Sequence, residues 1–291
     1  MPPGLQTPEG PCFDCGAELV PAERHCPTCK ADAGAPNVRQ CHTSENIKAL
    51  ADRYDTAREQ ASRAGCLREF EALENILKQK SGVVVSMSPG VARGLLEDPR
   101  KLYSNYEQLV GAHVRKPSAT EDDRTRCAVG GQLFGSYADH IIYGALSLTE
   151  SGLATYGEVY CRLRDSAVAK RTSFLETNSY RFVQMHQLTA GGKIHEGSIG
   201  CWLQRHQLAL AKVVDSLRLG QVESVWQDIL ICSDGKNRAK DEFIEAHTYE
   251  GFDRNAIESL VPASGVHLSR NEQLDLDVAM DVFRSHRGQV K

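Results

Sequence analysis

The chain has 291 residues, of which 41% are hydrophobic and 25% charged, and its formal net charge is −4 at pH 7. This length supports a sizeable hydrophobic core, and the mildly acidic balance excludes a general electrostatic attraction to nucleic acid or to an anionic membrane. No apolar run reaches the roughly 18 residues of a transmembrane helix, and the first ten residues, MPPGLQTPEG, lack the basic and apolar regions of a signal peptide. We therefore expect a cytoplasmic protein without membrane contacts.

Four cysteines near the start of the chain form two C-x-x-C pairs. Cys12 and Cys15 enclose CFDC, Cys26 and Cys29 enclose CPTC, and ten residues separate the pairs. Each pair can hold a metal ion through a tight turn, and four thiolates leave no coordination position for a reacting water. The segment resembles a short zinc ribbon over residues 10–31, which implies one structural zinc ion per chain. The other six cysteines are scattered, as is typical of a protein in a reducing compartment.

The role of such a ribbon stays open at this stage. Small ribbons bind nucleic acid, bind proteins or cap a neighbouring domain. In this one the negative charges of Glu18 and Glu23 balance the positive charges of Arg24 and Lys30, and there is no basic stripe with interleaved aromatic residues. Nucleic-acid binding is therefore allowed but not indicated.

A linker and a helical segment are predicted after the ribbon. Residues 31–40, ADAGAPNVRQ, have the composition of a linker, so we expect residues 1–40 to form a separable zinc ribbon and linker. Thr43 or Ser44 can cap a helix that runs to Gln79 and fills a helical segment at 41–80. Its apolar residues recur at steps of three and four over fewer than three heptads, which favours packing within the chain. A homodimer or a partner protein bound through residues 45–79 is the alternative.

Residues 81–291 mix strands and helices without a regular βαβ rhythm. Strands are predicted within 81–88, 138–148, 155–164 and 242–252, and a strand or strand-and-loop within 171–183. Helices are predicted within 91–99 and 201–217, and from a capping box at Ser269 and Glu272 to Phe283. The pattern predicts an α+β domain with a largely antiparallel sheet, which is the candidate catalytic part of the chain.

Motifs of several common enzyme classes are missing from the sequence. It contains no phosphate-binding glycine loop, dinucleotide-binding fingerprint, H-E-x-x-H or G-x-S-x-G. His195, in the glycine-rich stretch GGKIHEGSIG, is either a solvated loop residue or a base. His140 is expected beside a strand, and His206 on the surface of a helix.

The stretch RTSFLETNSYRFV, residues 171–183, concentrates hydroxyl, carboxylate, amide and guanidinium groups directly after a predicted strand. It is either the floor of a substrate pocket or a polar edge of the sheet. The longer segment TYGEVYCRLRDSAVAKRTSFLETNSY resembles ADP-ribosyltransferase-like domains of bacterial and phage toxins and effectors. There, a Y-G-x-hydrophobic strand precedes an R-T/A-x-F strand that ends in a small polar pair. The corresponding residues are Tyr156, Gly157, Arg171, Thr172, Ser173, Phe174, Asn178 and Ser179.

A later strand of that family carries a glutamate between hydrophobic residues, and EFIEAHTYEGF supplies Glu245 and His247 in this arrangement. The resemblance extends over residues 82–262. The chain departs from the family pattern in having no Ser-Thr-Ser triplet, Glu-Ala-His in place of Glu-x-Glu or Gln-x-Glu, and no arginine or histidine in the first strand, VVVSMS. Ser86 and Ser88 are the polar side chains available for that first-strand role.

The resemblance implies an enzyme that transfers ADP-ribose from NAD to a macromolecular acceptor, either protein or nucleic acid. Glu245 would be the catalytic carboxylate, because a carboxylate beside the ribose stabilises the positive charge that develops when nicotinamide leaves. The residues that would bind NAD are Tyr156, Arg171, Ser173, Asn178 and Ser179. The structural alternative is that Arg171, Ser173 and Asn178 form cross-strand pairs and a turn, while Glu245 forms a salt bridge.

Two functions of other classes remain open. One is a nucleic-acid-processing toxin, such as a metal-independent nuclease that uses His247 or His195. It would need a second acid or base and a basic groove, which the acidic net charge disfavours. The other is a non-catalytic adaptor in which the ribbon and the long helix bind a partner.

Overall fold

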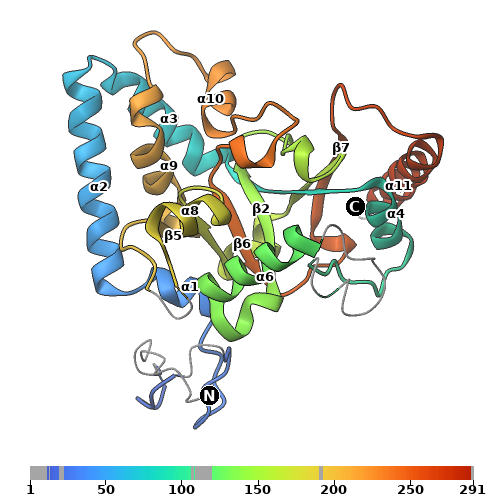
Figure 1. Ribbon diagram of the computed structural model, residues 1–291, viewed down its shortest axis with the longest axis horizontal. Helices are drawn as coiled ribbons and strands as arrows, with labels where there is room; N and C mark the ends of the chain where they lie inside the picture. Colours follow the sequence, from blue (N-terminus) through green and yellow to red (C-terminus); the bar gives the residue numbers. More distant parts are fainter. Residues whose placement is uncertain are drawn as a thin grey trace.

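The computed structural model describes residues 12, 14–19, 23–105, 108, 120–189 and 193–289 (Figure 1). Its centre is a seven-stranded antiparallel sheet with the strand order β5-β4-β6-β2-β1-β3-β7. The α+β class and the antiparallel sheet expected from the sequence are thereby confirmed. The strands are β1 (Gly82–Met87), β2 (Ile141–Ser147), β3 (Val159–Leu163), β4 (Thr172–Leu175), β5 (Ile199–Cys201), β6 (Glu245–Tyr249) and β7 (Ile257–Pro262).

Helices lie on both faces of this sheet. They are α1 (Pro36–Cys41), α2 (Ser44–Arg63), α3 (Leu67–Lys80), α4 (Pro89–Glu97), α6 (Thr120–Phe134), α7 (Asp165–Val168), α8 (Ser179–His186), α9 (Arg205–Val213), α10 (Glu223–Leu230) and α11 (Arg270–Gln289). The predicted capping box is present, since the Ser269 amide donates to Glu272 Oε2 at 2.8 Å and the Glu272 amide donates to Ser269 Oγ at 3.4 Å. None of the described helices is both long and apolar enough to cross a lipid bilayer.

The helix predicted from residue 44 to Gln79 is divided in two. Thr43 caps α2 by accepting a hydrogen bond from the Asn46 amide at 3.3 Å. The chain then turns at Gly65, where φ is +74°, a backbone conformation that glycine adopts without steric cost, and α3 begins at Leu67. Most of the apolar stripe along both helices is buried within the chain, packed with residues of α9 and of the sheet, whereas Ile47 near its start is exposed.

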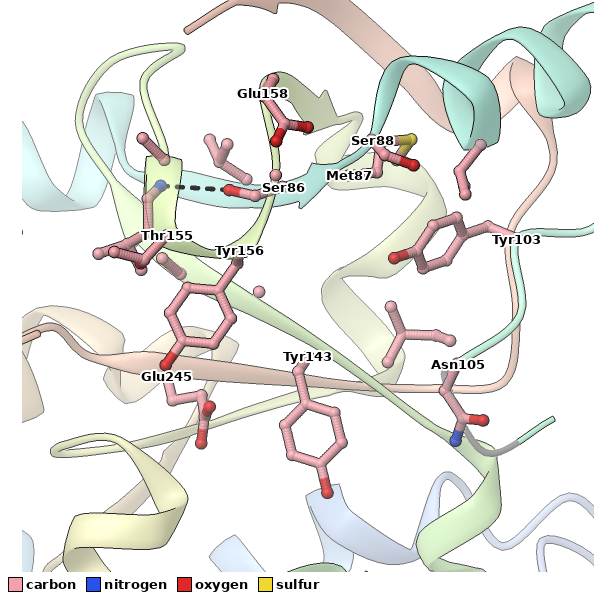
Figure 2. Close-up of a pocket in the computed structure, with 18 of the residues that line it drawn as sticks. Ser86, Met87, Ser88, Tyr103, Asn105, Tyr143, Thr155, Tyr156, Glu158 and Glu245 are labelled. Atoms are coloured by element: carbon pink, nitrogen blue, oxygen red, sulfur yellow. Dashed lines mark hydrogen bonds between the residues drawn. The ribbon is translucent and has the colours of Figure 1, made fainter. Parts of the chain in front are cut away.

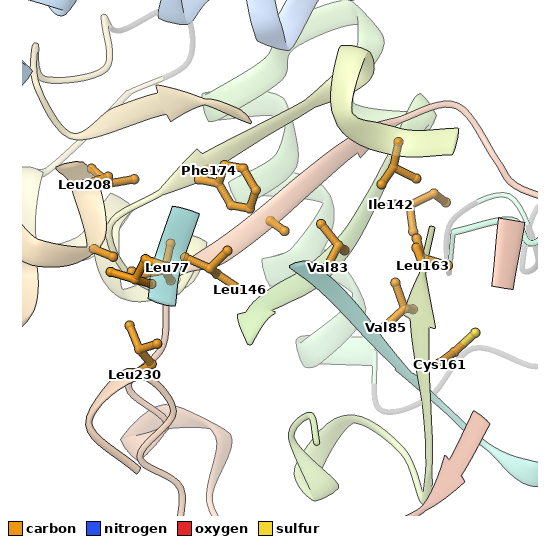
Figure 3. Close-up of a cluster of buried hydrophobic side chains, with 14 of the residues drawn as sticks. Leu77, Val83, Val85, Ile142, Leu146, Cys161, Leu163, Phe174, Leu208 and Leu230 are labelled. Carbon is orange, nitrogen blue, oxygen red and sulfur yellow. The ribbon is translucent and has the colours of Figure 1, made fainter. Parts of the chain in front are cut away.

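Two hydrophobic clusters cover the two faces of the sheet. The larger one joins the sheet to α2, α3, α9, α4 and α11, and Figure 3 shows Leu77 and Leu208 packed toward Val83, Leu146 and Phe174. Side chains alternate across a strand, so β1 gives Val83 and Val85 to this core while Val84 lines a cavity on the opposite face. The smaller cluster joins α1, α6 and α8 to that opposite face.

Residues 31–40 are not simply a linker, because the second half of this stretch begins helix α1. Asn37 of α1 is 1% exposed, and its Nδ2 donates to His247 O at 2.7 Å, to Ser173 Oγ at 3.0 Å and to Arg171 O at 3.3 Å. These acceptors belong to or adjoin β4 and β6. The composition of the stretch gave no sign of these contacts, since they depend on which strands lie beneath the helix.

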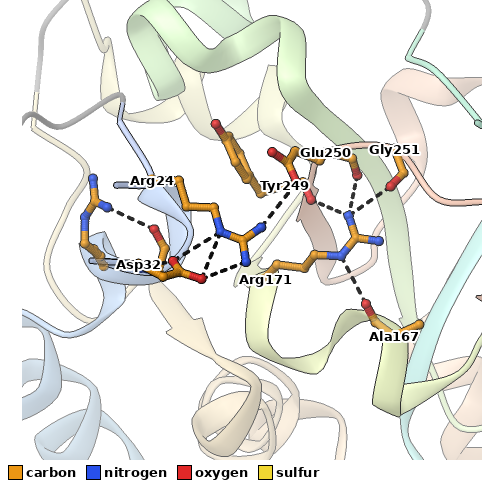
Figure 4. A network of polar contacts seen from close by, with 9 residues as sticks. Arg24, Asp32, Ala167, Arg171, Tyr249, Glu250 and Gly251 are labelled. Atoms are coloured by element: carbon orange, nitrogen blue, oxygen red, sulfur yellow. Dashed lines mark hydrogen bonds and ion pairs between the residues drawn. The ribbon is translucent and has the colours of Figure 1, made fainter. Parts of the chain in front are cut away.

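A second contact joins the cysteine-rich segment itself to the sheet. Arg24 pairs with Asp32 at 2.8 Å within the segment and reaches Glu250, just after β6, at 3.3 Å (Figure 4). Arg39 of α1 donates to the carbonyl oxygens of Glu23 and Gly34 at 2.8 and 2.9 Å. The segment is therefore attached to the end of the strand that begins at Glu245.

Candidate functional site

A cavity of about 270 Å³ lies on the face of the sheet opposite the larger core. Its floor comes from β1, β2 and the start of β6, and its walls come from residues 103–105 and from the 3-10 turn η2 (Ala154–Tyr156). Figure 2 shows the polar side chains that surround it, and these are Ser86, Ser88, Tyr103, Asn105, Tyr143, Thr155, Tyr156, Glu158 and Glu245. Several polar groups converge on this cavity, as in small-ligand pockets, and its volume lies just below their usual range of roughly 300–1,000 Å³.

Glu245 is the first residue of β6, an inner strand that pairs with β2 and β4. Its side chain is 7% exposed. Three groups contact Oε2: the Ser179 amide at 2.8 Å, the Ser179 hydroxyl, and His247 Nε2 at 3.1 Å. Among the described residues, every side-chain hydrogen bond of Glu245 goes to Oε2, which leaves Oε1 for a ligand in the cavity.

His247 lies on the same side of β6 as Glu245, because side chains two residues apart in a strand share a face. Its Nε2 is 3.1 Å from Ser179 Oγ and 3.1 Å from Glu245 Oε2. The single hydroxyl hydrogen of Ser179 is directed to the carboxylate, so His247 Nε2 must carry the hydrogen that faces both oxygens. The imidazole packs edgewise against Phe134 and Tyr143, with ring centroids 4.8 and 5.3 Å away.

Ser179 reaches Glu245 because of how α8 begins. Asn178 caps this helix, and its Oδ1 accepts from the amides of Tyr180 at 2.9 Å and Arg181 at 3.4 Å. The amide of Ser179, in the first turn, has no acceptor within the helix and donates to the carboxylate instead. The positive end of the helix dipole also favours a negative charge at this position.

Tyr156 is joined to Asn178, the residue before Ser179. Its hydroxyl accepts a hydrogen bond from Asn178 Nδ2 at 2.7 Å. The following Gly157, with φ of 157°, lies so close to β1 that a Cβ there would come within 2.6 Å of Met87 backbone atoms. Glycine is therefore required for the turn to bring Tyr156 to the cavity. Of the predicted NAD-binding residues, Tyr156 lines the cavity, whereas Asn178 and Ser179 lie behind its wall, where Asn178 contacts Tyr156 and Ser179 contacts Glu245.

Arg171 and Ser173, also predicted to bind NAD, lie elsewhere. The Arg171 guanidinium donates to the carbonyl oxygens of Tyr249, Glu250 and Gly251, and its Nε donates to Ala167 O (Figure 4). These contacts support the chain where it leaves β6.

The position of Ser173 follows from strand register. Ser173 is paired with His247, whereas Leu175 is paired with Glu245 at the level of the cavity. The serine is therefore two pairs further along the strand, where Asn37 of α1 covers it. Neither Ser173 nor Arg171 lines the cavity.

The other histidines named from the sequence are outside the cavity. The His195 ring stacks on His186 with centroids 4.3 Å apart, and the His140 ring lies 5.8 Å from Tyr249. His206, expected on a helix surface, is partly buried in α9, and this burial lowers its pKa to about 4. None of the three can act on a ligand held by Glu245.

Several residues of the cavity wall carried no signal in the sequence. Tyr103, Asn105, Glu158 and Arg238 come from loops or loop edges that the chain brings together only by folding. Tyr143 lies within a predicted strand, but only the register of β2 against β6 places it opposite His247. Ser86, a first-strand candidate, lines the cavity, and its Oγ accepts from the Leu153 amide at 3.1 Å (Figure 2).

The four N-terminal cysteines form a second candidate site, of a different kind. Their Sγ atoms all lie within 4.8 Å of one another, and the Cys12–Cys29 and Cys15–Cys26 pairs are 3.6 Å apart. Four thiolates at about 2.3 Å from one tetrahedral zinc ion would be about 3.8 Å apart, so the cluster fits the ion. The Gly16 amide donates to Cys12 O at 2.9 Å and the Lys30 amide to Cys26 O at 3.0 Å, which closes the two turns.

No protein-family model matches the sequence, and no curated protein is detectably similar to it.

Proposed function

We propose that the protein transfers ADP-ribose from NAD to a macromolecular acceptor, and that its zinc ribbon is structural. The observation that carries the proposal is Glu245, a carboxylate on the wall of a cavity with one oxygen held by Ser179 and His247 and the other left for a ligand. The transferase resemblance predicted this glutamate together with Tyr156, Asn178 and Ser179, and all four lie within one group of contacts.

Glu245 has two tasks in this reaction. The bond between ribose C1′ and the nicotinamide nitrogen breaks, nicotinamide leaves with the bonding electron pair, and positive charge develops on the ribose. The negative charge at Oε1 stabilises that charge, and the low exposure of the carboxylate strengthens the effect. The acceptor nucleophile then bonds to C1′ and gives its proton to Oε1.

The residues around Glu245 orient it. Donors from Ser179 and His247 hold Oε2 and thereby keep the carboxylate in one rotamer. Tyr156, held by Asn178 at its hydroxyl, presents its ring at the cavity wall for packing against the ribose that carries the nicotinamide. Arg171 and Ser173 have no part in this arrangement, because both are engaged in contacts outside the cavity.

Incubation with labelled NAD and a cell extract tests the proposal. We expect wild-type protein to label a polymer, and digestion with protease or nuclease then shows whether that polymer is protein or nucleic acid. Glu245→Gln keeps the size of the side chain and removes its charge, so labelling should be lost. The matched control is Glu196→Gln, because Glu196 is an exposed carboxylate paired with Lys193 at 2.6 Å.

Three outcomes separate this function from its rivals. Labelling that survives in Glu245→Gln, or is absent in wild type, refutes the proposal. Degradation of nucleic acid without NAD would indicate the nuclease. If neither activity occurs and wild type does not bind NAD, a non-catalytic adaptor becomes the better explanation.

A further inference from the structure

The cavity wall includes one cationic side chain among the residues that the structure describes, and this is Arg238. The centre of its guanidinium lies 5.0 Å from the centroid of the Tyr156 ring, and its Nε donates to Thr155 O at 2.7 Å. The other charged wall residues are the carboxylates Glu158 and Glu245. An arginine stacked on an aromatic face and bonded to a backbone carbonyl has a defined orientation, which lowers the entropy lost when it binds a ligand.

The loop that carries Arg238 is itself fixed in position. An isolated β-bridge between Cys232 and Glu242 closes it, with hydrogen bonds of 2.8 and 2.9 Å. Asp241 is 1% exposed and accepts from the hydroxyls of Thr155 and Ser233, each at 2.5 Å. Thr155 therefore holds the loop twice, through its side chain to Asp241 and through its carbonyl to Arg238. These contacts place the guanidinium at the cavity.

We infer that Arg238 binds the diphosphate of the nucleotide substrate, which makes the cavity selective for ligands that carry this group. The inference rests on the proposed function. Guanidinium groups match phosphate oxygens with two parallel hydrogen bonds. Arg238 lines the cavity, whereas Arg171 lies outside it at the end of β6.

The order of groups along the wall supports this assignment. Tyr156 contacts Arg238 with its ring face and Asn178 with its hydroxyl, and Asn178 precedes Ser179, which holds Glu245. The cation, the aromatic ring and the carboxylate thus all line one cavity, with Tyr156 in contact with Arg238 and joined to Glu245 through Asn178 and Ser179. A dinucleotide with its diphosphate at Arg238 extends its ribose along Tyr156 toward Glu245, where the bond at C1′ is broken.

Calorimetric binding of ADP-ribose and of nicotinamide riboside to the full-length protein tests the inference, since only the first ligand carries the diphosphate. In Arg238→Gln we expect the Kd for ADP-ribose to rise by about 10- to 100-fold, as for loss of a charged hydrogen-bonding partner. The Kd for nicotinamide riboside should change by less than about twofold. Arg238→Lys should give an intermediate loss, because it keeps the charge without the planar fork.

Lys236→Gln is the matched control, because Lys236 is an exposed cation on the same loop that does not line the cavity. It should leave both affinities within about twofold. Unchanged ADP-ribose binding in Arg238→Gln, or equal losses in Arg238→Gln and Lys236→Gln, overturns the inference while the proposed function stands. Failure of wild type to bind either ligand overturns the proposed function and the inference with it.

Discussion

Replacement of Asn37 by alanine should destabilise the whole protein, although Asn37 lies in a stretch with the composition of a linker. The substitution removes the Nδ2 donor from His247 O and Ser173 Oγ, both buried acceptors. Each lost hydrogen bond costs about 1 kcal/mol, and acceptors left without a partner add about 1–3 kcal/mol. Asn37 Oδ1 has no partner among the described residues, so its removal offsets part of this loss. We expect a net decrease of about 2–3 kcal/mol in the free energy of unfolding.

Urea denaturation, followed by both fluorescence and circular dichroism, measures this change. Gln40→Ala is the control, because Gln40 is a less buried amide in the same helix and should cost less than about 0.5 kcal/mol. Asn37→Asp should be worse than Asn37→Ala, at about 4 kcal/mol, because it points a carboxylate at acceptor oxygens. Equal unfolding midpoints for Asn37→Ala and Gln40→Ala would refute the reasoning and would support the prediction that residues 1–40 are separable from the rest of the chain.

Three further outcomes are expected. Metal analysis should find one zinc ion per chain, lost in a Cys12→Ser, Cys26→Ser double variant, and a wild-type content near zero would contradict the ribbon. His206 has a pKa lowered to about 4 by burial against an ordinary 6.5, so the unfolded state binds its proton first and stability falls by about 3 kcal/mol as the pH falls from 6.5 to 4. His206→Gln should flatten this part of the pH profile of stability, and an unchanged slope would refute the assignment. Arg171→Lys should lower stability by about 1–3 kcal/mol without changing the Kd for NAD. A larger Kd for NAD with normal stability would indicate instead that Arg171 binds NAD.

The fold was predictable wherever a segment has a strong local pattern. The β-branched run of β1, the apolar residues of β2 and the capping box before α11 each depend on neighbouring residues only, and all three elements are present. Elements without such a pattern were missed. β5 has three residues, too few for a periodicity, and α8 was included in a predicted strand-and-loop although Asn178 is a favourable helix cap. The sequence shows a glycine at the break between α2 and α3, but it does not show that the backbone φ of Gly65 is positive.

The residues of the candidate site were likewise predictable only where a local pattern marks them. Tyr156, Asn178 and Ser179 adjoin a strand end or a turn, and such positions face ligands in many folds. Ser173 belongs to the same polar stretch, yet strand register places it two pairs away from Glu245, beneath α1. Register is a long-range property that composition does not report. Arg238 could not be found from the sequence at all, because only the contacts of Thr155 with its loop bring it to the wall.

Release of nicotinamide from NAD by purified wild type and Glu245→Gln tests the central claim most directly. Calorimetric binding of NAD by the same two proteins should accompany it, because the substitution is expected to remove charge at Oε1 without removing the cavity. We predict that nicotinamide release falls by at least about 100-fold in Glu245→Gln while the Kd for NAD changes by less than about fivefold. Equal rates of nicotinamide release by the two proteins would contradict the assignment of Glu245 as the catalytic carboxylate.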